Sequence, residues 1–223
     1  MFKIQEPIAV ANLIIETAKK NHLDVNNLHL QKALFFAQGY FINKYATPLF
    51  DGTFVRWQYG PYEKAVYDAF RDVGSGPITS PALDVYTDDK GYFHVDKPKI
   101  TNLGGKYQED LKQAILGLLH IPAWTLWELI KKDKTFADYK ELTNDYKAPD
   151  YTNRDVVECF KRNKFFLLPK IEMITENANG EYTVEADGYD HTVVLSYVNR
   201  SKYRVHEYGN GTIVLIPIGD QYD

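Results

Sequence analysis

The chain has 223 residues, 44% hydrophobic and 25% charged, which is enough for one globular domain or for a larger domain with a small appendix. Its 26 Lys and Arg against 30 Asp and Glu give a formal net charge of −4, which argues against nucleic acid as a partner because no overall basic field attracts phosphates. The single cysteine, Cys159, excludes an intramolecular disulfide framework and a multi-thiolate zinc site.

The N-terminal residues lack a basic region followed by an apolar stretch, so no secretion signal is expected. No uncharged apolar run approaches the roughly 20 residues that a transmembrane helix needs. We therefore expect a cytoplasmic protein with no membrane span, and a lone cysteine suits that reducing compartment.

Helical periodicity dominates the first part of the chain. Pro7 suits the first position of an amphipathic helix, whose apolar face carries Ile8, Ala11, Ile14, Ile15 and Ala18. A second helix is expected over residues 28–45, where aromatic residues widen the apolar stripe almost to a full circumference. Such a helix belongs in a core.

Residues 54–59 form a short β-prone run. We expect Gly60-Pro61 to turn the chain into a third helix that ends at Gly74, because proline fits the first helical turn and glycine accepts unusual backbone dihedrals. Residues 84–99 are polar and rich in turn signals, which predicts an exposed loop or a weak hairpin.

Helices are expected to resume near Gly105 and again after Ile121-Pro122. Thr152 and Asp155 have the spacing of an N-terminal capping pair, which predicts a last helix through Phe160.

Beyond residue 165 the pattern changes to β-branched and aromatic runs separated by hairpin signals. Five short strands are expected near residues 166–175, 181–186, 191–198, 202–208 and 212–218. The predicted fold class is α+β: a mainly α-helical domain at 1–164 and a small C-terminal antiparallel β-meander at 165–223. The meander segment holds 4 Lys and Arg against 9 Asp and Glu, so it is acidic, whereas the rest of the chain is nearly neutral.

No motif for catalysis is found: there is no His-Glu-x-x-His, no paired-thiolate spacing, no Gly-x-Ser-x-Gly and no phosphate-binding loop. Gly74-Ser75-Gly76 is followed by Pro77 and Pro81, which prevent a phosphate-binding helix N-terminus. The cluster of Asp187, Asp190 and His191 is explained by a turn. The six histidines are scattered. We expect no enzyme, no catalytic residue, no metal and no cofactor; an undetected hydrolase stays the remote alternative.

One stretch of the sequence carries a motif that is specific to a family. Leu30-Gln31-Lys32-Ala33-Leu34-Phe35-Phe36-Ala37-Gln38 is followed by Pro48-Leu49-Phe50-Asp51, by Phe54 and by Trp57-Gln58-Tyr59-Gly60-Pro61. In order and spacing this segment resembles the Panacea domain, with a motif core at about 8–78. The resemblance implies a non-enzymatic antitoxin of a toxin–antitoxin pair, often carried by a prophage, that contacts its cognate toxin directly. It also implies an alternative: a proteolytic adaptor that delivers the toxin to an ATP-dependent protease, or a phage regulatory protein that modulates a host protein.

Six residues are candidates for partner binding. Trp, Tyr and Arg dominate interface hot spots, and two glutamines seven residues apart on an apolar helix need hydrogen-bond partners. The candidates are Gln31, Gln38, Arg56, Trp57, Tyr59 and Tyr62. For Trp57 the choice lies between core packing and an interface anchor, and for the glutamines between partners inside the domain and on the toxin. The acidic C-terminal segment is expected to add specificity for a basic toxin.

Overall fold

The computed structural model describes residues 2–144, 146–163, 174–176, 182–185, 203–207 and 212–217. The chain divides into two compact units, Met1–Arg162 and Asn163–Asp223. The first unit is mainly helical, and the second contains a small sheet.

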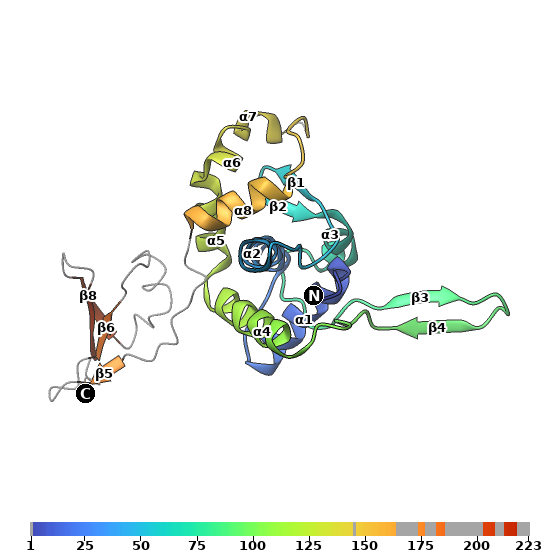
Figure 1. Ribbon diagram of the computed structural model, residues 1–223, viewed down its shortest axis with the longest axis horizontal. Helices are drawn as coiled ribbons and strands as arrows, with labels where there is room; N and C mark the ends of the chain where they lie inside the picture. Colours follow the sequence, from blue (N-terminus) through green and yellow to red (C-terminus); the bar gives the residue numbers. More distant parts are fainter. Residues whose placement is uncertain are drawn as a thin grey trace. The chain divides into compact units, whose positions relative to one another are not determined.

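Eight helices make up most of the described part of the first unit. They are α1 (Pro7–Lys20), α2 (Asn27–Tyr45), α3 (Lys64–Phe70), α4 (Gly105–His120), α5 (Ala123–Lys132), α6 (Lys134–Ala137), α7 (Lys140–Thr143) and α8 (Asn153–Arg162). In Figure 1, α2 is seen end-on with α1, α3, α4, α5 and α8 around it. Every residue from His29 to Phe41 is buried, which confirms the prediction of a core helix.

Local sequence signals fix both ends of α2. The side chain of Asn26 accepts a hydrogen bond from the backbone N–H of His29 at 2.9 Å, as an N-cap should. At the other end Ala46 adopts a left-handed conformation with φ 51°, and its N–H bonds to the carbonyl of Ile42. The helix α1 begins at Pro7 and buries Ala11, Ile14, Ile15 and Ala18 of the predicted apolar face, while Ile8 is only half-buried.

The expectation that Gly60-Pro61 opens a helix is wrong. Strand β1 (Phe54–Trp57) pairs antiparallel with β2 (Gly60–Glu63), and α3 begins only at Lys64. Gly60 does use the freedom expected of glycine: its φ is 86°, which lets the chain reverse after Tyr59 and enter the second strand. Helix α3 begins after Glu63, which is its N-cap: the Glu63 carboxylate accepts a hydrogen bond from Val66 N at 2.8 Å.

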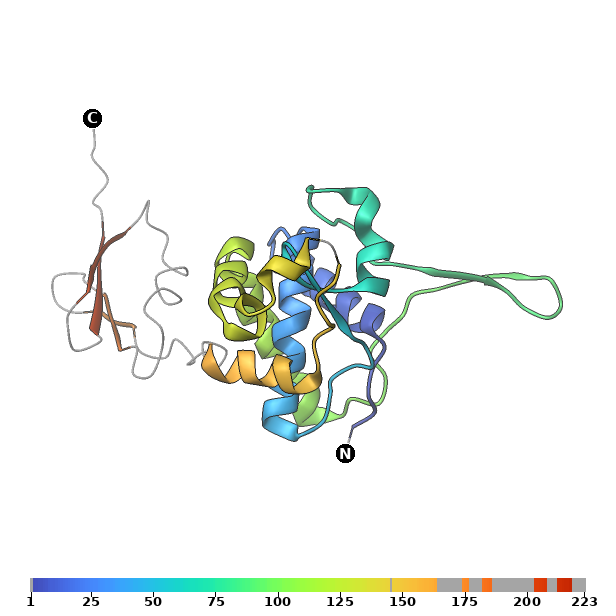
Figure 2. The same ribbon diagram turned by 90° about the horizontal axis from the view of Figure 1, so that it is seen from above.

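Of the two alternatives predicted for residues 84–99, an exposed loop or a weak hairpin, the structure has the hairpin: β3 (Asp84–Thr87) pairs with β4 (Phe93–Asp96). Both views show it extending away from the helices (Figures 1 and 2). All four residues of β3 are exposed. The side chain of Asp88 accepts from the backbone N–H groups of Lys90 and Tyr92, which explains the tight turn at its tip.

The last helix of this unit begins where the sequence predicts. Thr152 Oγ1 accepts from Asp155 N at 3.1 Å, while Asp155 Oδ2 accepts from Thr152 N at 2.9 Å, so the two residues form a reciprocal capping box for α8. The short helices α6 and α7 were not predicted, because four residues carry no helical periodicity.

The described strands of the second unit are β5 (Ile174–Glu176), β6 (Tyr182–Glu185), β7 (Tyr203–Glu207) and β8 (Thr212–Pro217). They are antiparallel in the order β5-β6-β8-β7, so the simple meander order is wrong. β8 is the longest of them and its Thr-Ile-Val-Leu-Ile run suits a strand with neighbours on both sides. The predicted strand at 191–198 lies outside the described residues.

Candidate functional site

A groove of about 510 Å³ lies where α2 begins, beside the β1–β2 hairpin. Residues from α2, both strands, α3, the loop after it and the start of α5 line this aromatic groove: Asn26, Asn27, Leu28, Gln31, Lys32, Trp57, Tyr59, Tyr62, Tyr67, Gly74, Ser75 and Trp124.

Four aromatic rings form one wall of the aromatic groove. The ring centroid of Trp57 lies 5.2 Å from that of Tyr59, 5.6 Å from that of Tyr62 and 5.9 Å from that of Tyr67, each time edge to face. Tyr59 and, on the α5 side, Trp124 are largely exposed. Rings that combine an apolar body with a polar tip suit a surface that exchanges water for another protein.

Two side-chain amides of α2 line the same groove. Gln31 is 3% exposed and Asn27 is 9% exposed. The Oε1 atom of Gln31 accepts from the backbone N–H of Glu63 at 2.7 Å, but its Nε2 atom has no hydrogen-bond partner, and neither does Oδ1 of Asn27. A buried polar group without a partner costs about 1–3 kcal/mol of stability, so these two atoms destabilise the protein when nothing is bound in the groove.

Lys32 is buried beside these amides. Its Nζ atom donates to the carbonyl of Pro61 at 3.0 Å and lies 5.7 Å from the ring centroid of Trp127. Burial removes the ammonium group from water, and this loss outweighs the distant cation–π contact, so the pKa of Lys32 falls to about 7. The charge of this lysine therefore changes near neutral pH.

The predicted partner-binding residues separate into two groups. Gln31, Trp57, Tyr59 and Tyr62 come together in the lining of the aromatic groove. Trp57 is half-buried, so it is neither a core residue nor a freely exposed one. Whether a partner contacts these residues stays a prediction.

Gln38 and Arg56 lie elsewhere, and their polar atoms are occupied inside the fold. Gln38 Oε1 accepts from the backbone N–H groups of Leu49 and Phe50 at 2.9 and 3.2 Å, and its Nε2 donates to Phe50 O at 3.1 Å. Of the two alternatives predicted for the glutamines, Gln38 therefore has its hydrogen-bond partners inside the domain.

Arg56 is 1% exposed and holds the later part of the helical unit against β1. It donates to the carbonyls of Thr135, Pro149 and Asp150 and to the carboxylate of Asp155. Its guanidinium also lies over two rings, those of Tyr139 and Tyr151, with distances to the centroids of 4.3 and 4.0 Å. A side chain with this many internal contacts is structural.

Eight residues of the groove lining were not among the candidates predicted from the sequence: Asn26, Asn27, Leu28, Lys32, Tyr67, Gly74, Ser75 and Trp124. Lys32 had a usable signal, because a lysine on a helix that is apolar around its circumference must be buried. The exposed tryptophan had none, since α5 is brought to the groove only by the packing of the helices.

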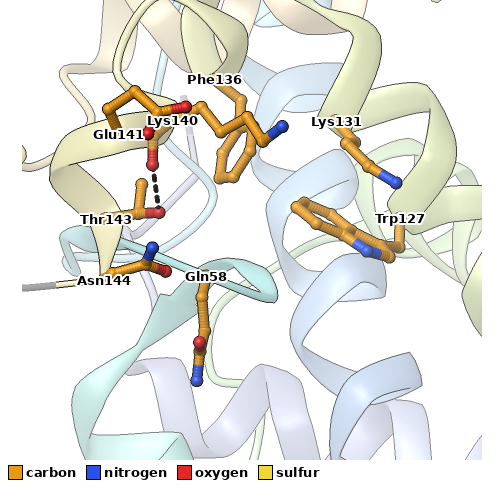
Figure 3. A pocket seen from close by; sticks show the side chains of 8 residues that line it. All are labelled: Gln58, Trp127, Lys131, Phe136, Lys140, Glu141, Thr143 and Asn144. Atoms are coloured by element: carbon orange, nitrogen blue, oxygen red, sulfur yellow. Dashed lines mark hydrogen bonds between the residues drawn. The ribbon is translucent and has the colours of Figure 1, made fainter.

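A smaller hollow of about 320 Å³ lies between α5, the α6–α7 segment and the β1–β2 turn (Figure 3). Its lining mixes both charges: Gln58, Trp127, Lys131, Phe136, Lys140, Glu141, Thr143 and Asn144. Thr143 Oγ1 donates to the carbonyl of Lys140 at 2.7 Å, so the hydroxyl closes its own helical turn.

Two negative findings concern the described residues alone. Among them, no three His, Cys, Asp or Glu side chains are grouped so that they could hold a metal ion. None of the helices in these segments is both long and apolar enough to cross a bilayer.

Comparison with known proteins gives one relative and one family. Antitoxin SocA of Caulobacter vibrioides (strain NA1000 / CB15N) is 39% identical over 75 residues, which are 34% of this chain and 40% of that protein. The chain thus matches less than half of that relative's length. No solved structure matches the chain. The family profile described as "Antitoxin SocA-like, Panacea domain" matches residues 30–177, well over half of the sequence. The chain therefore belongs to the SocA-like antitoxin family with a Panacea domain.

Proposed function

We propose that this protein is an antitoxin that neutralises a cognate toxin by direct protein–protein binding and catalyses no reaction itself. Membership of a SocA-like antitoxin family supports the role. The observation that carries direct binding is the β3–β4 hairpin, which offers apolar side chains to a partner instead of burying them in its own domain.

Half of the large exposed apolar side chains among the described residues lie on this hairpin or next to it. Phe93, at the start of β4, is 81% exposed. Others on the hairpin or next to it are Leu83, Val85, Tyr86, Tyr92 and Val95. Val85 pairs with Val95 and Phe93 pairs with Thr87, so Val85, Val95 and Phe93 share one face of the hairpin. Exposed apolar side chains grouped in this way favour an interaction site.

The hairpin also has open edges. Within the described residues β3 and β4 pair only with each other, and an isolated two-stranded hairpin is marginally stable in water. Such a hairpin can accept a strand from a partner along either edge. Because it carries Asp84, Asp88, Asp89 and Asp96 against Lys90, it favours a basic toxin surface.

We further propose that the acidic C-terminal unit adds specificity for that toxin, and that the pair acts in the cytoplasm of a bacterium that carries it on a prophage. The excess of acidic residues at 165–223 supports electrostatic steering of a basic partner. Deletion of residues 165–223 should weaken rescue from the toxin; unchanged rescue would remove this part of the proposal.

The central test is co-expression. The product of the neighbouring gene, expressed alone, should stop growth, and this protein should restore it and co-purify with that product. The double variant Val85→Ser/Phe93→Ser should rescue less well at equal expression, whereas Leu142→Ser, an exposed leucine on α7, should rescue like the wild type. A toxin that disappears only when an ATP-dependent protease is present would instead indicate delivery for degradation. A neighbouring product that neither stops growth nor binds would contradict the proposal.

A further inference from the structure

We infer that the aromatic groove binds an extended segment of the toxin and that the backbone C=O and N–H of one residue in this segment pair with Gln31 and Asn27. The inference rests on the proposed function and adds to it a second contact, distinct from the β3–β4 hairpin. Three observations carry it: the unpaired amide atoms, the arrangement of the rings and the position of Lys32.

The two unpaired atoms are complementary to the backbone C=O and N–H of one extended residue. The bond from Glu63 N to Oε1 fixes the orientation of the Gln31 amide, because the flipped amide would point its NH₂ at an N–H donor. Nε2 of Gln31 is therefore a donor without an acceptor, and Oδ1 of Asn27 is an acceptor without a donor. In an extended chain the C=O and N–H of one residue point to the same side, so together they supply the two missing partners.

The two amides also share a helical face. Asn27 and Gln31 are four residues apart on α2, and side chains at this spacing are neighbours. Both side chains line the aromatic groove, and both unpaired atoms are shielded from solvent, so water does not replace the missing partners. A ligand that packs against the exposed rings of Tyr59 and Trp124 and reaches the two amides gains these hydrogen bonds.

The rings favour a peptide over a nucleotide base. A base is held by stacking on open ring faces. Here Trp57 meets Tyr59, Tyr62 and Tyr67 edge to face, with interplanar angles of 87°, 69° and 67°, so the wall consists of interlocked rings with no parallel slot. Such a wall accepts the aliphatic or aromatic side chains that flank a peptide group.

Lys32 adds a donor for an acceptor of the bound segment. Its amine donates to Pro61 O, and whether it is charged or neutral it keeps at least one more N–H group. Among the lining residues it is the one cationic side chain, and it is buried, so the groove has no exposed basic group for a phosphate.

Overlapping 15-residue peptides of the toxin, without tryptophan, are the probe. The chain has three tryptophans, of which Trp57 and Trp124 line the groove and Trp127 contacts Lys32, so intrinsic fluorescence of the full-length protein reports occupancy. At least one peptide should shift the emission. Asn27→Leu should weaken its binding about tenfold or more, because a buried peptide N–H loses its acceptor. The same variant should be at least as resistant to urea as the wild type, because it removes an unpaired polar atom.

Asn12 supplies the matched control. Its amide also lies buried on a helix, but it donates to the carbonyls of Ala82 and Pro98 and accepts from Ala82 N. Asn12→Leu should therefore lower resistance to urea and leave peptide binding unchanged while the protein is folded. Trp124→Ala, at the exposed rim, should weaken peptide binding without a loss of stability.

The inference is wrong if Asn27→Leu binds the peptide like the wild type, if this variant is clearly less stable, or if no peptide binds. It is also wrong if adenosine monophosphate, titrated in parallel, occupies the groove in place of the peptides. A complex with the whole toxin that forms normally in Asn27→Leu and Trp124→Ala would remove the groove contact and leave the proposed function standing. Only a wild-type protein that fails to bind the toxin removes both.

Discussion

Arg56 and Asp155, 99 residues apart in the chain, form an ion pair with 3.0 Å between Nη2 and Oδ2. Asp155 belongs at the same time to the capping box of α8 with Thr152. Burial alone raises the pKa of Asp155, but the hydrogen bonds from Thr152 and Arg56 outweigh it, so the pKa lies below its ordinary value. One buried guanidinium thus joins the first hairpin to the last helix of the unit.

Arg56→Met should therefore destabilise the protein. We expect a loss of about 3 kcal/mol in the free energy of unfolding, the low end for a broken buried pair, because Asp155 keeps some contact with water. Arg56→Lys should recover less than half of it, since one ammonium group cannot reach three carbonyls and a carboxylate together. Urea unfolding measures both. Arg154→Met, on the exposed face of α8, is the control, and an equal loss there would contradict the argument.

Gly39→Ala should also destabilise the protein, despite the better helix propensity of alanine. An added Cβ would lie 2.7 Å from Phe160 Cβ and 3.2 Å from the carbonyl of Val156, where α2 and α8 meet. The expected cost of overpacking, about 1–3 kcal/mol, exceeds the gain of about 1 kcal/mol from propensity. Thermal unfolding should show a lower midpoint. At Gly76 a Cβ meets only an ordinary contact of 3.5 Å, so Gly76→Ala should cause no such loss.

Lys32 should make stability rise with pH above neutrality. Its pKa is about 7 in the folded protein and about 10.4 in an unfolded chain, so between these values the unfolded state binds the extra proton. The free energy of unfolding should then increase by about 2 kcal/mol between pH 7 and pH 9. Urea titrations at several pH values should show this slope in the wild type and in Lys131→Met, but not in Lys32→Met. An unchanged slope in Lys32→Met would assign the effect to another group.

Replacement of residues 84–96 by a Gly-Ser link should leave the helical unit stable. The residues of β3 and β4 are almost all exposed, so they add little to the core. The free energy of unfolding should change by no more than about 0.5 kcal/mol, as for surface changes in general. Ala82 and Pro98, which bond to Asn12, are kept. Loss of the folded state on calorimetry would show that the hairpin supports the domain.

Much of the helical unit was predictable because its signals are local. Helices begin at Pro7, after Asn26 and at the Thr152–Asp155 pair because of contacts within a single helical turn. The apolar residues all around α2 indicate a core helix. Where a local signal had two uses, the prediction was wrong. Gly60-Pro61 fits a helix start and also a strand after a tight turn, and pairing with Trp57 and Arg56 decided for the strand.

The sequence by itself determined the longer helices of the unit and the family resemblance, because periodicity, caps and motif spacing are properties of neighbouring residues. It left the stretch at residues 84–99 as either a loop or a hairpin. Only the tertiary structure decided that Gln38 and Arg56 are structural while Gln31, Tyr59 and Tyr62 share a groove with Trp124. A polar side chain is satisfied by whatever backbone group packing brings within about 3 Å of it, and for Arg56 those carbonyls lie 79 to 94 residues along the chain.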